Sequence, residues 1–202
     1  RLGDVEYAIP YLLLLNIFFH NFLNSNLLFI QRNMFPLKNL MKIIKPKAGQ
    51  ESVWEYPRPP AVEAVTDHLR IIFNGEVIAD TNTSYRVLET SHPPTYYLPV
   101  SSFKDGTLIE GTHSTACEFK GISFYYDIIS GDKKVLNAAW GYPTPNGKFK
   151  VIKEHIAVYA HKVDSCYVGN EKVEPQEGDF YGGWITSKIV GPFKGIKGSW
   201  GW

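Results

Sequence analysis

The sequence predicts a small, mainly β domain built from antiparallel strands, with one short helix. Aromatic residues make up 14% of the chain, and they favour pleated sheets over helical bundles. Short alternating segments also recur at close spacing with turn residues between them. In addition, Asn74-Gly75 separates two apolar runs, which is a strong hairpin signal because a type I′ turn needs positive φ at both central residues.

The composition is that of one soluble globular domain. A chain of 202 residues is long enough for a single well-buried core and too short for two large ones. Its formal net charge of +1 provides no positive field that would gather phosphates, so we expect no nucleic-acid partner. Cys117 and Cys166 are too few for a disulfide framework or a four-thiolate zinc site, which favours a reducing, cytoplasmic location.

Residues 1–40 differ from the rest of the chain. They are rich in Phe, Leu, Ile and Asn, and the first methionines are Met34 and Met41. They lack the roughly 20 apolar residues of a transmembrane helix and the charged start and cleavage site of a signal peptide. We therefore expect an upstream segment that is disordered or foreign to the natural protein, as translation of an AT-rich region would give. The alternative is an anchor on a membrane surface; for the domain itself we expect no membrane partner.

The next segment, residues 41–66, is predicted to be an extended, proline-rich strap. Pro57, Pro59 and Pro60 forbid a helix, while Trp54 and Tyr56 give the strap side chains to bury. We expect this strap to lie across the domain.

A compact β domain is expected over residues 67–176. Phe149 and Ile152 at helical spacing predict its one short helix, ending near Glu154, and a helical turn is expected at 99–105. The expected strands are 69–73, 76–80, 85–90, 107–110, 114–119, 121–129, 135–142, 156–160, 165–168 and 171–173.

A Gly-rich tail, residues 177–202, follows the domain. It contains Trp184, Trp200 and Trp202, which a disordered linker would not carry. We therefore expect the tail to pack on the domain.

The candidate site centres on the corner between residues 85 and 99, where Pro93 and Pro94 interrupt a strand. We expect His92 to be a general base and Glu89 to be the carboxylate that orients it. Lys120 would stabilise negative charge. The alternative is that His92 only caps the Pro-Pro turn.

Cys117 lies three residues before Lys120. Residues at this spacing on a strand point to opposite faces, so Lys120 can stabilise a Cys117 thiolate only if Gly121 marks a bulge or turn. The alternative is a buried and inert thiol.

Aromatic side chains from distant segments complete the predicted pocket. They suit a flat or cationic ligand, although a Tyr-rich core is an alternative interpretation. The expected ligand-binding residues are Tyr96, Tyr97, Cys117, Trp140, Tyr142 and Trp184. We predict no cofactor and no metal site, because only Glu89 and His92 are placed to ligate one ion together.

Several motifs in one order resemble a known family, the domain of unknown function 427, over residues 41–202. The motifs are Glu51-Ser-Val-Trp-Glu-Tyr-Pro-Arg-Pro-Pro, Glu89-Thr-Ser-His-Pro-Pro-Thr-Tyr-Tyr, Ala139-Trp-Gly-Tyr-Pro, Tyr181-Gly-Gly-Trp-Ile-Thr and Gly191-Pro-Phe-Lys-Gly. The resemblance implies a small tent of antiparallel strands of the Mss4-like kind. The family is sometimes labelled nucleotidyltransferase-like, and its Cys-x-Trp-Lys-Gly motif has Phe119 in place of Trp here.

Together these features predict a small-ligand-binding protein, which is an enzyme if Glu89 and His92 form an acid/base pair. One alternative is a nucleotidyltransferase-like enzyme. That activity needs a Gly-Ser phosphate loop and paired carboxylates on one strand face, neither of which is evident in the sequence. The other alternative is a non-catalytic interaction module whose aromatic cage holds a peptide or a modified side chain.

Overall fold

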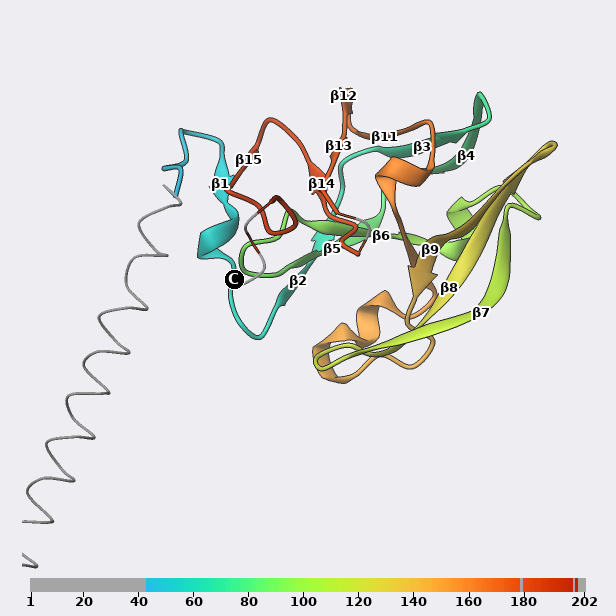
Figure 1. The fold of residues 1–202 in the computed structure, drawn as a ribbon, viewed down its shortest axis with the longest axis horizontal. Coiled ribbons are helices and arrows are strands. Elements are labelled where there is room, and N and C mark those ends of the chain that lie inside the picture. The colour runs from blue at the N-terminus through green and yellow to red at the C-terminus, as the bar shows by residue number, and fades with distance from the viewer. Residues whose placement is uncertain (1–42, 179, 198, 200–202) are drawn as a thin grey trace, which may run out of the picture. The chain divides into compact units, whose positions relative to one another are not determined.

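A computed structural model describes residues 43–178, 180–197 and 199, and over these residues the fold is mainly β, as predicted (Figure 1). The predicted upstream segment, 1–40, lies outside the described residues, and so do Trp200 and Trp202 of the tail. Within the described residues, no helix is both long and apolar enough to cross a membrane.

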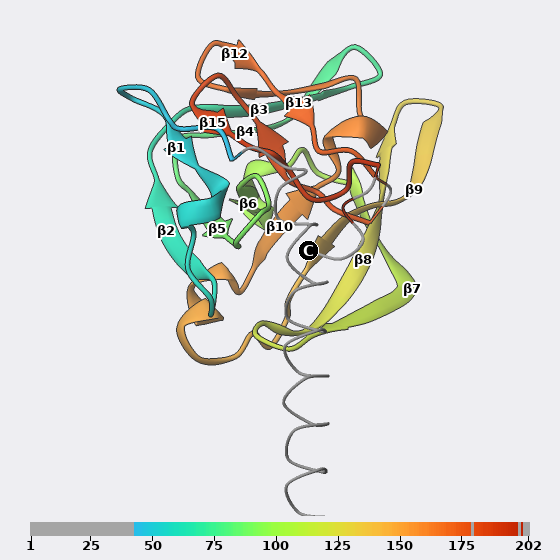
Figure 2. The ribbon, with the colours of Figure 1, turned by 60° about the vertical axis from the view of Figure 1, so that its left-hand side comes forward.

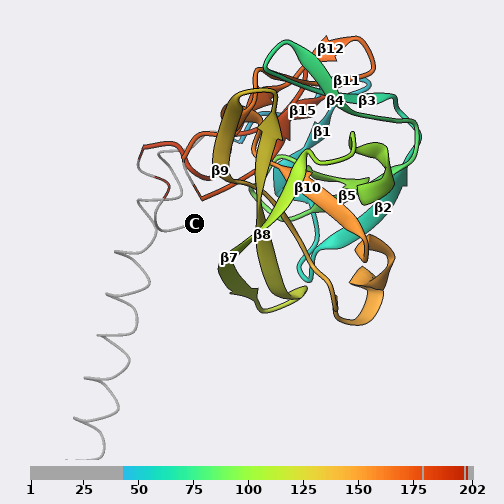
Figure 3. The same cartoon turned by 90° about the vertical axis from the view of Figure 1, so that its right-hand side faces the viewer.

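A seven-stranded antiparallel sheet is the centre of the fold, with the strand order β2-β5-β6-β10-β9-β8-β7. The long strands β7, β8 and β9 run together as a twisted ribbon (Figure 1, Figure 3), and β10 joins them to β6 (Figure 2). The strands span Ala61–Val65 (β2), Ser84–Leu88 (β5), Thr95–Pro99 (β6), Leu108–Cys117 (β7), Gly121–Ser130 (β8), Lys133–Gly141 (β9) and His155–Val158 (β10). The expected strands 107–110 and 114–119 are thus one strand, β7, whose register shifts between Glu110 and Ser114.

A second antiparallel sheet has the order β12-β11-β3-β4. Its strands span Leu69–Phe73 (β3), Glu76–Thr81 (β4), Ser165–Val168 (β11) and Glu171–Lys172 (β12). Asn74 and Gly75 have φ values of 53° and 73°, which confirms the predicted hairpin between β3 and β4. The Asn74 side chain also donates a hydrogen bond of 2.9 Å to the Ser130 carbonyl, so the turn is tied to the end of β8.

The two faces of the large sheet carry different side chains. Successive residues on a strand point to opposite faces, so on β6 Leu98 joins a mainly aliphatic core whereas Tyr97 joins an aromatic cluster. On β10, Ile156 and Val158 face the aliphatic core and Ala157 faces the aromatic cluster. The buried members of this aromatic cluster are Val87, Tyr97, Tyr125, Trp140, Tyr142, Phe149, Ile152, Ala157 and Tyr159.

The predicted strap, 41–66, divides into two parts. Residues 61–65 form β2, the edge strand of the large sheet, because the segment after the last proline has free N–H groups that can pair with β5. The extended part therefore ends at Pro60, and we name residues 43–60 the arm. The arm contains β1 (Glu51–Ser52), which runs parallel to β15 (Ile189–Val190) (Figure 2), and the short 3₁₀ helix η1 (Val53–Glu55).

Three further 3₁₀ helices are η2 (Val100–Ser102), η3 (Gly147–Ile152) and η4 (Ala160–Lys162). The predicted short helix corresponds to η3, which buries Phe149 and Ile152. The described part of the tail is packed on the domain, where β14 (Trp184–Ile185) pairs with β13 (Glu174–Pro175). Trp184 is fully buried, and its indole N–H donates to the Val158 carbonyl at 3.0 Å.

Candidate functional site

The aromatic face of the large sheet borders a cavity of about 220 Å³, which we call the aromatic cavity. Segments that are far apart in the sequence meet there: the corner after β5 with β6, the β7–β8 hairpin, the end of β9, the end of β10 and the tail around Tyr181. The lining residues are Glu89, His92, Tyr97, Thr115, Ala116, Cys117, Lys120, Ser123, Tyr125, Trp140, Tyr142, Tyr159, Phe180, Tyr181 and Gly182. Every predicted site residue except Tyr96 and Trp184 is therefore at this cavity.

The corner after β5 brings Glu89 and His92 to the same cavity. The His92 amide donates a 3.0 Å hydrogen bond to the Glu89 carbonyl and closes a turn, in which Ser91 has a φ of 69°. Pro93 and Pro94 follow and prevent the strand from continuing directly, so the chain resumes as β6 only at Thr95.

The imidazole of His92 is oriented by the backbone. Its Nδ1 lies 2.9 Å from the Thr90 carbonyl oxygen, and because a carbonyl can only accept, Nδ1 carries the proton and Nε2 of the neutral ring is an acceptor. Burial lowers the pKa of His92 and outweighs the opposing effects of the Thr90 carbonyl and Glu89, so the ring is neutral at pH 7. The ring of Tyr181 packs edge-on against the imidazole, with centroids 4.7 Å apart.

Glu89 does not have the predicted role of orienting the His92 ring. Its carboxylate accepts a 2.7 Å hydrogen bond from the Lys120 ammonium. The hydrogen bond from the imidazole Nδ1 goes to the backbone carbonyl of Thr90 instead. The physical reason is charge: a buried ammonium attracts a carboxylate more strongly than a neutral imidazole does.

Lys120 is a buried cation, with only 6% of its side chain exposed. Burial is the largest influence on its pKa and opposes the charge, but the attraction of Glu89 and smaller neighbouring contributions reverse the balance, and the pKa is raised. The ammonium also lies 6.0 Å from the ring centroid of Tyr142 and 5.9 Å from that of Phe149. The Lys120 ammonium has three N–H groups and donates one of them to Glu89, so the others can donate to a bound molecule.

The β7–β8 turn decides how Cys117 and Lys120 face each other. Residues 118–120 form the turn, and Gly121, which follows it, has a φ of 101°. Cys117 and Lys120 are therefore separated by a turn and need not point to opposite faces, as they would on a continuous strand. Cys117 and Lys120 consequently line the same cavity. The turn itself is covered by Arg58, whose guanidinium lies 5.2 Å from the ring centroid of Phe119, the residue that replaces Trp in the motif.

The cavity lining also contains a row of hydroxyl groups, of which sequence reasoning did not select Thr115 and Ser123. Thr115 and Ser123 face each other across β7 and β8, with their hydroxyl oxygens 2.8 Å apart, and the Tyr125 hydroxyl lies 3.3 Å from that of Thr115. Thr115 is two residues before Cys117 on the same strand, so the period of two along a strand was a signal that could have found it.

Tyr142 also lines this cavity. The residue is 6% exposed, and its ring centroid lies 6.0 Å from the Lys120 ammonium. Burial raises the pKa of the phenol far above its ordinary value, so the group keeps its proton and remains a donor.

Tyr96 and Trp184 lie on the other side of the sheet. Because Tyr97 faces the aromatic cavity, its neighbour Tyr96 must face the opposite way, where its ring packs on that of Trp184 with centroids 5.2 Å apart. Burial raises the pKa of Tyr96 to about 12. Both residues belong to the core cluster rather than to the predicted pocket.

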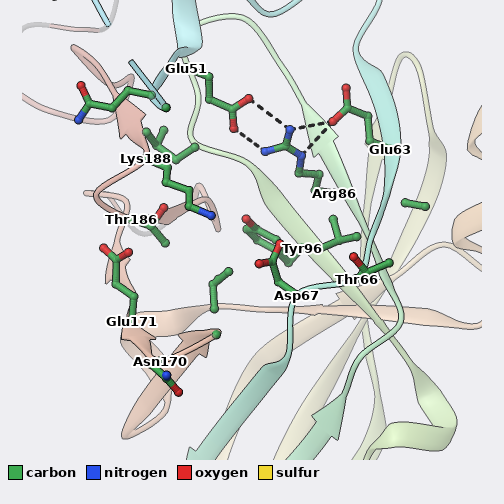
Figure 4. A pocket seen from close by; sticks show the side chains of 17 residues that line it. Glu51, Glu63, Thr66, Asp67, Arg86, Tyr96, Asn170, Glu171, Thr186 and Lys188 are labelled. Atoms are coloured by element: carbon green, nitrogen blue, oxygen red, sulfur yellow. Dashed lines mark hydrogen bonds and ion pairs between the residues drawn. The ribbon is translucent and has the colours of Figure 1, made fainter. Parts of the chain in front are cut away.

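Tyr96 instead lines a second hollow of about 750 Å³, which we call the charged groove (Figure 4). Arg86 lies in it between Glu51 of β1 and Glu63 of β2 and donates hydrogen bonds to both carboxylates. Burial tends to lower the pKa of Arg86, but the two carboxylates outweigh burial and raise it. Arg86 is thus already paired with two carboxylates of the chain. We therefore take the aromatic cavity, rather than the charged groove, as the candidate site.

Neither hollow gathers the residues of a metal centre. Among the described residues, no three or more His, Cys, Asp or Glu side chains are grouped so that they could hold a metal ion. The absence of a metal from the site remains a prediction.

Comparison with known proteins adds a family match. The model of the family described as domain of unknown function (DUF427) matches residues 61–169, which is more than half of the chain. The match includes every strand of the seven-stranded sheet and most of the cavity lining, while the arm and the tail lie outside it. No curated protein matches the chain.

Proposed function

Because the chain belongs to the DUF427 family, a domain of unknown function, we propose its function from the geometry of the aromatic cavity: the protein binds a small molecule there, and His92 accepts a proton from it. The observation that carries this proposal is the meeting of the Lys120–Glu89 ion pair and the acceptor atom Nε2 of His92 in one aromatic cavity. Ligand sites typically combine a few placed polar groups with a mostly apolar or aromatic wall.

The size of the cavity limits the ligand. Its volume of about 220 Å³ lies below the range of about 300–1,000 Å³ that is usual for drug-sized ligands. A molecule built on one ring, or on two small fused rings, suits this volume, and a complete nucleoside triphosphate exceeds it. We therefore favour small-molecule binding over nucleotidyl transfer, which also requires metal-binding carboxylates beside the triphosphate, whereas Glu89 is already paired with Lys120.

The same groups support acid/base catalysis. In the simplest reaction, the Nε2 of His92 removes a proton from the ligand, and the electron pair left behind moves to an oxygen next to the Lys120 ammonium. The proton then returns from His92 to another atom of the same ligand, so the reaction is an isomerisation and needs no other reactant.

Cys117 and Cys166 are both free thiols, which supports a cytoplasmic location.

A fragment screen with the purified full chain tests the proposal. Fragments that bind are located by crystallography or by NMR shifts of cavity residues, and their affinities are compared between the parent protein, Lys120→Met and Lys104→Met. Lys104 is the matched control because it also pairs with a glutamate, Glu76, but is 60% exposed and outside the cavity.

We expect bound fragments in the cavity, at least a tenfold loss of affinity in Lys120→Met and no loss in Lys104→Met. His92→Gln, which retains much of the polar volume, provides a second variant if Lys120→Met does not fold. Fragments that bind only outside the cavity, or that bind Lys120→Met and His92→Gln as tightly as the parent, would overturn the proposal.

A further inference from the structure

The hydrogen-bonding groups of the aromatic cavity specify the kind of ligand more closely than its size does. Two hydrogen-bond donors line the cavity, the Lys120 ammonium and the Tyr142 hydroxyl, and the ammonium is 6.0 Å from the Tyr142 ring centroid. The Nε2 of His92 is an acceptor, and the charge of Lys120 is close enough to influence the imidazole. A complementary ligand offers an acceptor oxygen to the two donors and, next to it, an N–H or O–H to His92.

Charge balance then separates neutral ligands from anions. Lys120 and Glu89 are paired at 2.7 Å and cancel each other, and burial keeps His92 neutral. A carboxylate entering this site would therefore be an uncompensated charge in a buried environment, which is costly. Lys194 is the other cation that influences His92, but it is not part of the cavity lining. The balance favours an uncharged acceptor, such as the carbonyl oxygen of an amide.

The walls favour a flat molecule. The ring centroids of Trp140 and Tyr159 are 4.4 Å apart, and Tyr97 packs edge-on against Trp140 at 6.4 Å. Planar rings of this kind interact well with a planar ligand through stacking and edge contacts. The hydroxyl row of Thr115, Ser123 and Tyr125 also lines the cavity, and its hydroxyl groups can donate hydrogen bonds to ring substituents or accept them.

We propose that the cavity takes an uncharged, planar ring compound in which an N–H stands beside a carbonyl, as in pyrimidinones and lactams. The carbonyl oxygen accepts hydrogen bonds from Lys120 and Tyr142, and the ring N–H donates to the Nε2 of His92. This inference rests on the proposed function and names the ligand class of the same site.

Three probes of similar size test the class, with affinities measured on the full chain by calorimetry or ligand-observed NMR. 2-Pyridone has the N–H beside the carbonyl, N-methyl-2-pyridone lacks the N–H, and benzoate replaces the neutral amide by an anion. We expect 2-pyridone to bind at least tenfold more tightly than either of the other two, because each of them leaves a buried polar group unpaired or a charge unbalanced.

Two conservative variants assign the binding to this cavity. Tyr142→Phe removes only a hydroxyl group from the cavity lining, and we expect it to weaken the binding of 2-pyridone about tenfold. Tyr167→Phe is the matched control on β11, outside the cavity, and we expect it to leave the affinity unchanged.

The possible results separate this inference from the proposed function. Tighter binding of benzoate, or equal binding of the N-methyl compound, overturns the neutral amide class while ligand binding in the cavity stands. The same holds if other fragments occupy the cavity and 2-pyridone does not. If no fragment of any class occupies the cavity, the proposed function itself fails.

Discussion

Lys120 and Glu89 form an ion pair whose two ends differ in burial. The Lys120 side chain is 6% exposed, whereas that of Glu89 is 32% exposed and retains part of its hydration. The free energy lost when one partner is removed depends on how well water can replace it, so the two possible single substitutions are not equivalent.

We predict that Glu89→Gln destabilises the domain more than Lys120→Met. Glu89→Gln leaves a buried ammonium without its counter-charge, which costs about 3–5 kcal/mol, whereas Lys120→Met leaves a carboxylate that water reaches, at about 1–2 kcal/mol. Urea unfolding of both variants measures the two free energies. Equal losses, or a larger loss in Lys120→Met, would contradict the burial argument.

His92 makes stability depend on pH in a defined direction. Its pKa in the folded protein is lowered from the ordinary value of 6.5, so below that pH the unfolded chain binds a proton that the folded chain does not. The free energy of unfolding therefore falls as pH decreases from 6.5 toward the folded pKa, with a slope of up to about 1.4 kcal/mol per pH unit from this group.

We predict that His92→Gln removes this part of the pH dependence. Unfolding curves of both proteins, measured from about pH 8 to about pH 5, should converge as the pH falls, because only the parent loses the contribution of a neutral His92. Parallel curves across this range would show that His92 titrates with its ordinary pKa in the folded protein.

At the scale of the elements, the packing of the tail against Trp140 of β9 requires glycine at position 182. A Cβ atom on Gly182 would overlap with Cη2 of Trp140, so only glycine allows the tail to pass over this indole ring and reach the core with Trp184. Glycine next to Trp in the motif around Tyr181 predicts close backbone packing, but the sequence does not identify Trp140 as the partner because it is distant in the chain.

We predict that Gly182→Ala displaces the tail and costs about 1–3 kcal/mol, as overpacking usually does. The Trp184 amide, which donates to the Pro94 carbonyl at 2.9 Å, should exchange its hydrogen faster. Gly169→Ala is the control: no atom lies within 4 Å of the added Cβ, so only its φ of 60° is strained, at about 1 kcal/mol. Unchanged exchange at Trp184 in Gly182→Ala would contradict the close contact with Trp140.

For the molecule as a whole, two arginines connect the arm region to the sheet in different environments. The Arg86 side chain is 22% exposed and bridges Glu51 of the arm and Glu63 of β2, whereas Arg58 of the arm is 73% exposed and pairs with Glu118. Since water screens exposed pairs, the two bridges should contribute unequally to stability.

We predict that Arg86→Met destabilises the protein by about 2–3 kcal/mol and Arg58→Met by at most about 1 kcal/mol. Arg86→Met leaves the partly buried carboxylate of Glu51 near the exposed carboxylate of Glu63, so the arm should also loosen. Hydrogen exchange at the Glu51 amide, which donates to the Lys188 carbonyl at 2.8 Å, reports this loosening. An equal loss of stability in the two variants would show that water screens the ion pairs of Arg86 to the same extent as that of Arg58.

Some features of the aromatic cavity could be predicted from the sequence because they depend on neighbouring residues, whereas others depend on contacts between distant segments. The sequence placed Glu89 and His92 at one corner because prolines restrict the backbone locally, and that placement agrees with the structure. It did not show that Glu89 pairs with Lys120 or that Thr90 orients His92, because both contacts depend on how a turn and a distant hairpin approach each other. It also left open which member of the Tyr96-Tyr97 pair faces the cavity, since alternation gives opposite faces but not which face is which.

The sequence by itself determined the mainly β class, the hairpin at Asn74-Gly75 and the proline corner, because each depends on the backbone preferences of neighbouring residues. It also determined membership of the family, through motifs spread along the chain. Only the tertiary structure decided that the hydroxyl row, the buried ion pair and Tyr181 share one cavity while Tyr96 and Trp184 lie in the core. The physical reason is that strand order and sheet packing bring these side chains together across long sequence separations, which local preferences do not encode.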